Sequence, residues 1–144
     1  MDIRFIYENS VSYQGYLIIP YILANAEYHP IYSYKLLSEL GHKGNFHQGE
    51  NPTGFYTNSV DKIIKVAQSH LYENSDVASE NDYFKLRYIY CNDLIIIHQE
   101  ADKFFYDHYQ PQSLTNIAAP KVFQSEYKCI NWVKAGIDQS KRNP

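Results

Sequence analysis

Cysteine is scarce in this sequence, and so are long apolar runs. The 144 residues include two cysteines, Cys91 and Cys129, without zinc-type spacing or a disulfide-dense pattern. The longest apolar run, residues 16–23, is too short to cross a bilayer and contains Pro20. The first ten residues lack the basic-then-apolar order of a secretory signal. We therefore expect a soluble, cytoplasmic protein with reduced thiols and no membrane association.

Familiar catalytic motifs are also missing. The chain contains no GxxxxGK[ST] phosphate loop, no HExxH metal motif and no GxSxG nucleophile elbow. We accordingly predict no cofactor and no metal site. The net charge of −3 argues against a protein that coats nucleic acid, because such binding needs an excess of basic side chains over the phosphates.

Tyrosine is the residue type in excess, with 15 copies. Its apolar ring and polar tip suit core edges and binding surfaces alike, and the composition leaves both interpretations open. The apolar content of 44% and charged content of 20% are ordinary for a globular protein. The length predicts a single domain, residues 1–144.

Residues 84–109 predict an antiparallel meander, because β-branched and aromatic residues alternate between turn-forming dipeptides. The expected strands are residues 84–91, 94–97 and 104–109, with turns at Asn92-Asp93 and Ala101-Asp102. This pairing sends one set of side chains to the core side: Leu86, Tyr88, Tyr90, Ile95, Ile97, Phe104 and Tyr106. The other side is mixed, with charged and polar residues among three apolar ones: Lys85, Arg87, His98, Glu100, Asp107, Ile89, Ile96 and Phe105.

The remaining elements complete an α+β fold. A first strand is expected at Ile3–Tyr7, and an edge or terminal strand at residues 16–19, because Pro20 cannot donate to a ladder. Helices are predicted at Pro30–Leu40, with proline at the start and glycine after the end, and at Ser59–Tyr72, from its apolar spacing. A third opens at Pro120 and carries an apolar stripe: Phe123, Tyr127, Ile130, Val133 and Ile137. We predict that the N-terminal strands extend the meander sheet and that these roughly three helices cover one face.

The mixed side of the meander is the first candidate site. His98 and Glu100 could exchange protons while Arg87 holds a phosphoryl group, with Asp107 nearby, which is a toolkit for metal-independent phosphodiester cleavage. Opposite charges across strands also arise on a solvated sheet face without any function. Both interpretations stay open.

The glycine-rich loop Gly41–Phe55 is the second candidate site. It carries four potential ligand-binding side chains: His42, Lys43, His47 and Glu50. Its amides could surround an anion, or its histidines could assist a metal-dependent hydrolase, although their spacing is not that of a known zinc motif. A plain connection between two elements is the alternative.

These patterns favour a small binding or regulatory module over an enzyme, although the sequence leaves enzyme status open. The module would hold a protein partner or a small anionic ligand through the tyrosine-rich sheet face or the 41–55 loop. The alternative is a metal-independent nuclease or phosphodiesterase that uses Arg87, His98 and Glu100. A homo-oligomer formed through the C-terminal helix or the sheet face is also considered, with Trp132 as an interface anchor.

Overall fold

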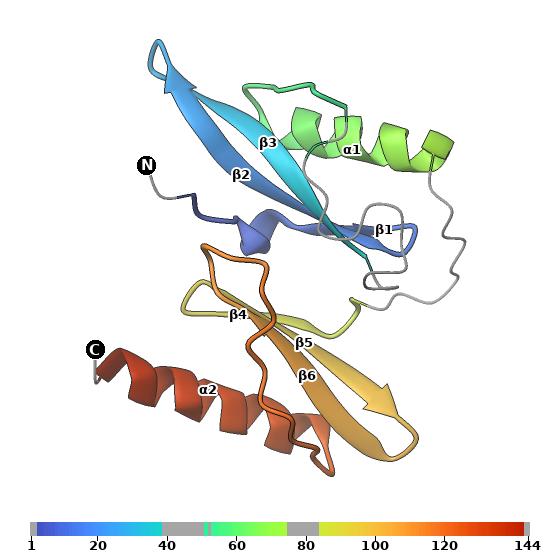
Figure 1. Cartoon of the computed structure of the whole chain (residues 1–144), viewed down its shortest axis with the longest axis vertical. Coiled ribbons are helices and arrows are strands. Elements are labelled where there is room, and N and C mark those ends of the chain that lie inside the picture. Colours follow the sequence, from blue (N-terminus) through green and yellow to red (C-terminus); the bar gives the residue numbers. More distant parts are fainter. Residues whose placement is uncertain (1–2, 39–50, 52, 75–83, 143–144) are drawn as a thin grey trace.

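Two three-stranded antiparallel sheets and two α-helices make up the computed structural model, which describes residues 3–38, 51, 53–74 and 84–142 (Figure 1). In chain order the elements are η1 (Tyr7–Asn9, a 3-10 helix), β1 (Val11–Tyr13), β2 (Tyr16–Ala26), β3 (His29–Ser38), α1 (Val60–Asn74), β4 (Arg87–Tyr90), β5 (Asp93–Glu100), β6 (Lys103–Tyr109) and α2 (Glu126–Arg142). The predicted α+β class is confirmed. The prediction of one extended sheet with three helices on one face is wrong for the described residues, because the N-terminal strands form a sheet of their own.

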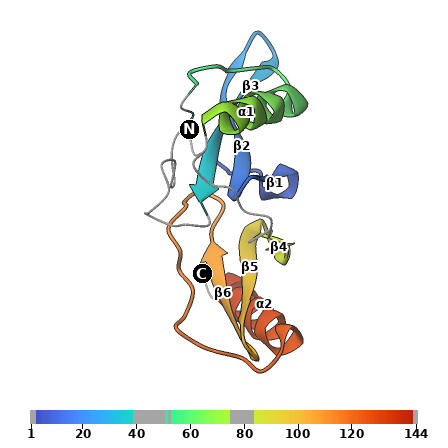
Figure 2. The ribbon, with the colours of Figure 1, turned by 90° about the vertical axis from the view of Figure 1, so that its right-hand side faces the viewer.

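The layers follow the order α1, first sheet, second sheet, α2 (Figures 1 and 2). Three apolar clusters join them: one between α1 and the first sheet, one between the sheets, and one between the second sheet and α2. Both faces of each sheet are therefore covered over much of their area. This double burial explains why β2 begins with six consecutive buried residues, Tyr16 to Tyr21, where a half-exposed strand would alternate.

The predicted meander is present, and its side chains lie on the predicted faces of the sheet. Its first turn lies one residue earlier than predicted. The loop between β4 and β5 is Cys91-Asn92, with φ of 53° and 70°, as a tight two-residue hairpin loop requires. Tyr90 pairs with Asp93 and Tyr88 with Ile95. Moving the loop by one residue shifts each partner by two positions, so every side chain keeps its face. All seven predicted core-side residues belong to the cluster beneath α2.

The opposite face of the meander is not the solvated surface that we expected. Leu94, Ile96 and Tyr109 lie on it and are buried against the first sheet. His98 lies on the same face and is only 7% exposed. The prediction of an open polar sheet face is therefore wrong, because a second sheet covers it.

Pro20 lies inside β2, the central strand of the first sheet. The strand predicted at residues 16–19 is therefore confirmed as part of β2, while its predicted edge or terminal position is wrong. The Pro20 carbonyl accepts a hydrogen bond from the Ile6 amide at 2.9 Å, while Tyr34 of β3 pairs with Pro20 on the other side. The N–H and C=O of a strand residue point the same way. The missing N–H therefore faces Ile6, beyond the end of β1, and the β2–β3 ladder loses no bond.

β3 occupies residues 30–38 of the segment Pro30–Leu40, for which we predicted a helix. The last two residues of that segment lie outside the described part of the chain. The spacing of Ile31, Tyr34 and Leu37 suits a helix, but tyrosine and isoleucine also suit a strand that is buried on both faces. Pro30 is tolerated because it pairs with Asn25 near the hairpin tip, on an edge strand.

The helix predicted at Ser59–Tyr72 is confirmed as α1. The helix predicted from Pro120 begins later, at Glu126, because Phe123 instead forms a strand-like bridge with Phe104. Most of its predicted stripe is buried, with Tyr127 left exposed. The expected strand at Ile3–Tyr7 is reduced to a bridge between Phe5 and Tyr21, followed by η1.

The two halves of the chain repeat one unit, three strands followed by a helix. Strands β3 and β6 make equivalent bridges to the segments that precede the helices, Tyr32 with Thr57 and Phe104 with Phe123. The buried positions of the helices share one spacing: Ile63, Ile64, Ala67 and Leu71 in α1, and Cys129, Ile130, Val133 and Ile137 in α2. Even the sequence before and within the second strand of each unit matches, as Tyr-x3-Leu-Ile-Ile at residues 13–19 and 90–96.

Candidate functional site

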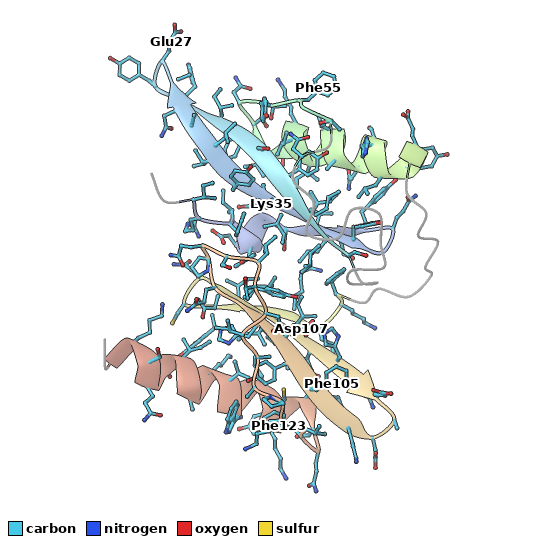
Figure 3. All side chains as sticks on the ribbon, in the orientation of Figure 1. Glu27, Lys35, Phe55, Phe105, Asp107 and Phe123 are labelled. Carbon is cyan, nitrogen blue, oxygen red and sulfur yellow. The ribbon has the colours of Figure 1, made fainter. Side chains whose placement is uncertain are left out.

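His98 and Asp107, two of the predicted catalytic residues, form a hydrogen-bonded pair. His98 Nε2 donates to Asp107 Oδ2 at 2.7 Å, and the ring of Phe105 lies 5.2 Å from the imidazole. Both members of the pair lie on the face of the second sheet that looks toward the first sheet. Asp107 and Phe123, which are labelled in Figure 3, mark the two opposite sides of the second sheet.

Arg87 and Glu100 are the other two predicted catalytic residues. The Arg87 guanidinium donates to the Phe84 carbonyl at 2.8 Å, and Glu100 is exposed opposite Lys103. His98 and Glu100 line a common hollow of about 370 Å³, together with Lys85, and Arg87 is not among its lining residues. The convergence of Arg87, His98 and Glu100 on one site therefore stays a prediction. The loop residues His42, Lys43, His47 and Glu50 lie outside the described part of the chain.

A second His–Asp pair, which our sequence analysis missed, lies on the α2 side of the same two strands. His108 Nε2 donates to Asp93 Oδ2 at 2.8 Å, with side chains 13% and 7% exposed. Consecutive residues of a strand point to opposite faces. Asp107 and His108 therefore turn away from each other, and each finds its partner diagonally across on β5.

The sequence contained a signal for this pair. Once Tyr106 and Ile95 are assigned to the core side of the meander, alternation puts His108 and Asp93 on that side too. Two ionisable side chains at positions expected in the core are unusual, because such groups are rarely buried without a partner.

A cavity opens beside this pair, between β6, the second half of α2 and the segment that connects them. Its volume is about 380 Å³, within the range of small-molecule sites. We call it the α2 cavity, and it is lined by Asp93, Tyr106, His108, Gln110, Pro111, Gln112, Ile117, Ala119, Trp132, Val133, Gly136, Ile137, Ser140 and Lys141.

The pair holds the imidazole of His108 in one orientation. A carboxylate only accepts hydrogen bonds, so Asp93 fixes the proton on Nε2. The other ring nitrogen, Nδ1, has no hydrogen-bond partner among the described residues. It is the atom of His108 that can donate to a ligand when the ring is charged, or accept from a ligand when the ring is neutral.

Asn116 ties the connecting segment to both His–Asp pairs. Its Oδ1 accepts from the His108 amide at 2.9 Å, and its Nδ2 donates to Asp107 Oδ1 at 2.9 Å. The next residue, Ile117, donates its amide to the His108 carbonyl at 2.8 Å. The wall of the cavity that carries Ile117 is thus held directly against β6.

The wall near Gln110 is supported from the N-terminal segment. The Tyr7 hydroxyl donates to the Gln110 carbonyl at 2.6 Å. Burial, reinforced by the negative charges of Asp93 and of ionised Tyr109, raises the pKa of Tyr7 far above its ordinary range. The hydroxyl therefore stays protonated and remains a donor.

The first unit provides an internal comparison for the α2 cavity. Register equates Asp93 with Tyr16, the first residue of β2, and His108 with Leu36, since His108 pairs with Ile95 and Leu36 with Ile18. Tyr16 and Leu36 are fully buried in an apolar cluster under α1. The same two positions are thus filled with apolar side chains in one unit and carry a polar pair beside open space in the other.

Gly136 is an exposed residue of α2. It lines the cavity from α2, and a Cβ atom built on it would meet no atom within 4 Å. Glycine in a helix interior destabilises the helix by roughly 1 kcal/mol relative to alanine. A side chain at this position would therefore have open space around it.

Neither a metal cluster nor a related protein assigns a chemistry to this site. Among the residues that the structure describes, no three His, Cys, Asp or Glu side chains are grouped so that they could hold a metal ion. Neither α1 nor α2 is long and apolar enough to cross a membrane. No protein family, no curated protein and no solved structure matches this chain.

Proposed function

We propose that this protein is a binding module for a small molecule, which it holds in the α2 cavity. The observation that carries the proposal is the contrast between the two units. Where Tyr16 and Leu36 fill the first unit, the second unit has Asp93 and His108 beside a cavity of about 380 Å³. A buried Asp–His pair next to open volume is a poor way to stabilise a core, because desolvating polar and charged groups is costly. It suits a site that must recognise a polar group on a ligand.

The lining supports binding more than catalysis. Apolar walls with a few convergent polar groups are typical of ligand pockets. An Asp–His pair can also act as a general base, but a nucleophile within reach would be needed for covalent chemistry. The two hydroxyl-bearing residues of the lining do not supply one beside His108. The Tyr106 hydroxyl accepts from the Ala119 amide, and Ser140 lies eight residues beyond Trp132 on exposed helix.

A variant in which a larger side chain fills the cavity tests this proposal. In Gly136→Leu the new side chain enters the cavity, while in Ala135→Leu the same side chain is added to an exposed neighbouring position outside it. A panel of small polar and aromatic compounds would be screened against the full chain by thermal shift. We expect compounds that raise the melting temperature of the wild type and of Ala135→Leu but not of Gly136→Leu. Compounds that stabilise all three proteins equally would contradict the proposal.

A nuclease remains the second candidate, and one observation favours it. His98, Glu100 and Lys85 line one hollow, which could accept a phosphate beside an imidazole and a carboxylate. Its test is RNA cleavage by the wild type and by His98→Gln in the presence of a chelator. Cleavage that disappears in the variant would support this candidate, and a wild type without activity would remove it. Binding of a protein partner and self-association stay predictions, which light scattering on the full chain tests.

A further inference from the structure

The hairpin that joins β2 to β3 projects beyond the rest of its sheet (Figures 1 and 2). We call its residues 23–29 the arm. All of them are exposed, although the two strands stay paired as far as Ala26 and His29. A strand that packs on one face would alternate between buried and exposed residues. Neither face of the arm is therefore covered by the part of the chain that the structure describes.

The arm is apolar for an exposed hairpin. It contains Leu23, Ala24, Ala26 and Tyr28, and it has no lysine or arginine. Charged side chains, lysine above all, are the usual protection of a bare strand against association. A two-stranded hairpin without further packing is also only marginally stable in water. Both properties favour an arm that another surface covers.

Tyr28, at the tip of the arm, is the most exposed large apolar residue of the described chain, at 103%. Its φ is 72°, and the φ of Glu27 is 49°. Tight hairpin loops with two positive φ angles prefer asparagine and glycine, and a bulky side chain in that conformation is strained. The arm therefore holds an aromatic ring in solvent at a conformational cost, and at this exposure the ring packs on nothing in the described chain.

A groove along α1 lies at the same end of the molecule, and we call it the α1 groove. Its volume is about 450 Å³, and Phe55, from the segment before the helix, and Val66 of α1 form its main apolar walls. Glu27 and Phe55, which are labelled in Figure 3, both lie at the end to which the arm projects. No residue of the arm lines the groove, so the chain does not fill the groove with its own arm.

The charges of the α1 groove are separated along the helix. Lys62 and Lys65 lie in the first two turns, whereas Glu73 lies in the last turn, about 16 Å from Lys62 at 1.5 Å per residue. The helix dipole adds positive potential at the N-terminal end, which is the end with the two lysines. The ammonium groups and the dipole therefore agree, and a negative group is best placed at Lys62 and Lys65.

We propose that the partner of the arm is a second copy of this chain, and that the tip of each arm lies in the α1 groove of the other copy. Glu27, the one carboxylate of the arm, then meets Lys62 and Lys65. The neighbouring ring of Tyr28 packs against Phe55, which is 65% exposed. Because arm and groove lie at the same end of the chain, a single two-fold axis produces both contacts. The groove shares no lining residue with the α2 cavity, so this inference is independent of the proposed function.

The mass of the full chain in solution, measured by sedimentation equilibrium over a range of concentrations, tests the proposal. We expect a reversible monomer–dimer equilibrium for the wild type. Tyr28→Ser should raise the dissociation constant of the dimer at least about 30-fold, because tyrosine is among the commonest interface anchors. Tyr127→Ser, which removes a 75% exposed tyrosine from α2, should leave that constant unchanged. A wild type that stays monomeric, or equal weakening by both variants, would overturn the proposal.

An exchange of charges tests whether the arm binds this groove. Glu27→Lys has a basic arm and a basic groove, and Lys62→Glu/Lys65→Glu has an acidic arm and an acidic groove, so neither variant should form a dimer alone. In an equimolar mixture each arm meets a groove of opposite charge, and a heterodimer should form. The three positions are exposed, and a folding defect would not be rescued by mixing. A mixture that stays monomeric, or a dimer formed by either variant alone, would contradict the assigned pairing of arm and groove.

Discussion

Two His–Asp pairs join β5 to β6, one on each face of the second sheet, and their surroundings differ. His98 and Asp107 lie between the sheets, where Asn116 also binds the carboxylate. Asp93 and His108 lie beside the α2 cavity and are mostly buried. Removing one member of such a pair leaves an uncompensated charge, whereas replacing both with apolar groups can be neutral.

The first unit supplies the replacement for the cavity pair. We expect His108→Leu alone to lower the free energy of unfolding by about 3–5 kcal/mol, because Asp93 loses its donor. The double variant Asp93→Tyr/His108→Leu, which installs the residues of the first unit, should recover most of that loss. Urea denaturation measures both. Equal stability of the single variant and the wild type would contradict a buried, mutually dependent pair.

The two cysteine thiols differ in burial. Burial, with a smaller contribution from the charge of Glu126, raises the pKa of the Cys129 thiol from 9.0 to about 11, while Cys91 is exposed. At pH 8 a thiol reagent should modify one cysteine in the native protein and two after denaturation.

The raised pKa of Cys129 also makes the free energy of unfolding depend on pH. The raised pKa favours the folded state fully below pH 9, and this contribution is lost as the pH rises toward 11, by up to about 1.4 kcal/mol per pH unit. In the thiol-reagent experiment, rapid modification of both cysteines of the native protein at pH 8 would show that Cys129 is not buried.

At the scale of elements, each of the two α-helices is capped at its N-terminus by a serine hydroxyl. The Ser59 hydroxyl accepts from the Lys62 amide at 3.4 Å, and the Ser125 hydroxyl from the Lys128 amide at 3.1 Å. We expect Ser125→Ala to cost about 1 kcal/mol of stability and Ser59→Ala somewhat less, because its bond is longer. Thermal unfolding of the two variants measures the difference. A loss in Ser59→Ala alone would contradict equivalent capping.

A helix with one periodic apolar face could be predicted from the sequence, and the stripe of α1 is confirmed. Strand β5 could be predicted although it is buried on both faces from Asp93 to His98, because turn-forming residues mark its two ends. β2 and β3 are buried on two faces, so their apolar residues run together and resemble either a terminal strand or a helix. The second sheet's polar face was misjudged for the same reason, since no local pattern shows that another sheet will cover it.

To predict the candidate site, one would need to know contacts between residues that lie even further apart in the sequence. Asp93 and His108 are 15 residues apart, and their pairing follows from strand register. The cavity beside them also needs Trp132 and Gly136, which a different element brings there. Neither residue belongs to a motif, so the sequence could indicate the two inward ionisable groups but not the space that they share.

At the scale of the whole molecule, the two units share the core between the sheets. Leu17 of β2 and Leu94 of β5 occupy equivalent positions, and both are fully buried in that core. Each substitution by alanine should cost about 2–5 kcal/mol. If the chain is one cooperative domain, Leu17→Ala shifts the unfolding midpoint of Trp132 fluorescence as much as Leu94→Ala does, although Trp132 belongs to the second unit. If Leu17→Ala leaves the unfolding midpoint of Trp132 fluorescence unchanged, the two units unfold independently.

The central claim, that the α2 cavity is the binding site, is tested most directly by one NMR signal. The chain has a single tryptophan, so an amide spectrum contains one indole cross-peak. A compound that stabilises the wild type should move this peak in the wild type and in Ala135→Leu, and leave it in place in Gly136→Leu. An indole peak that stays fixed while backbone peaks elsewhere move would contradict the account and direct attention to another surface.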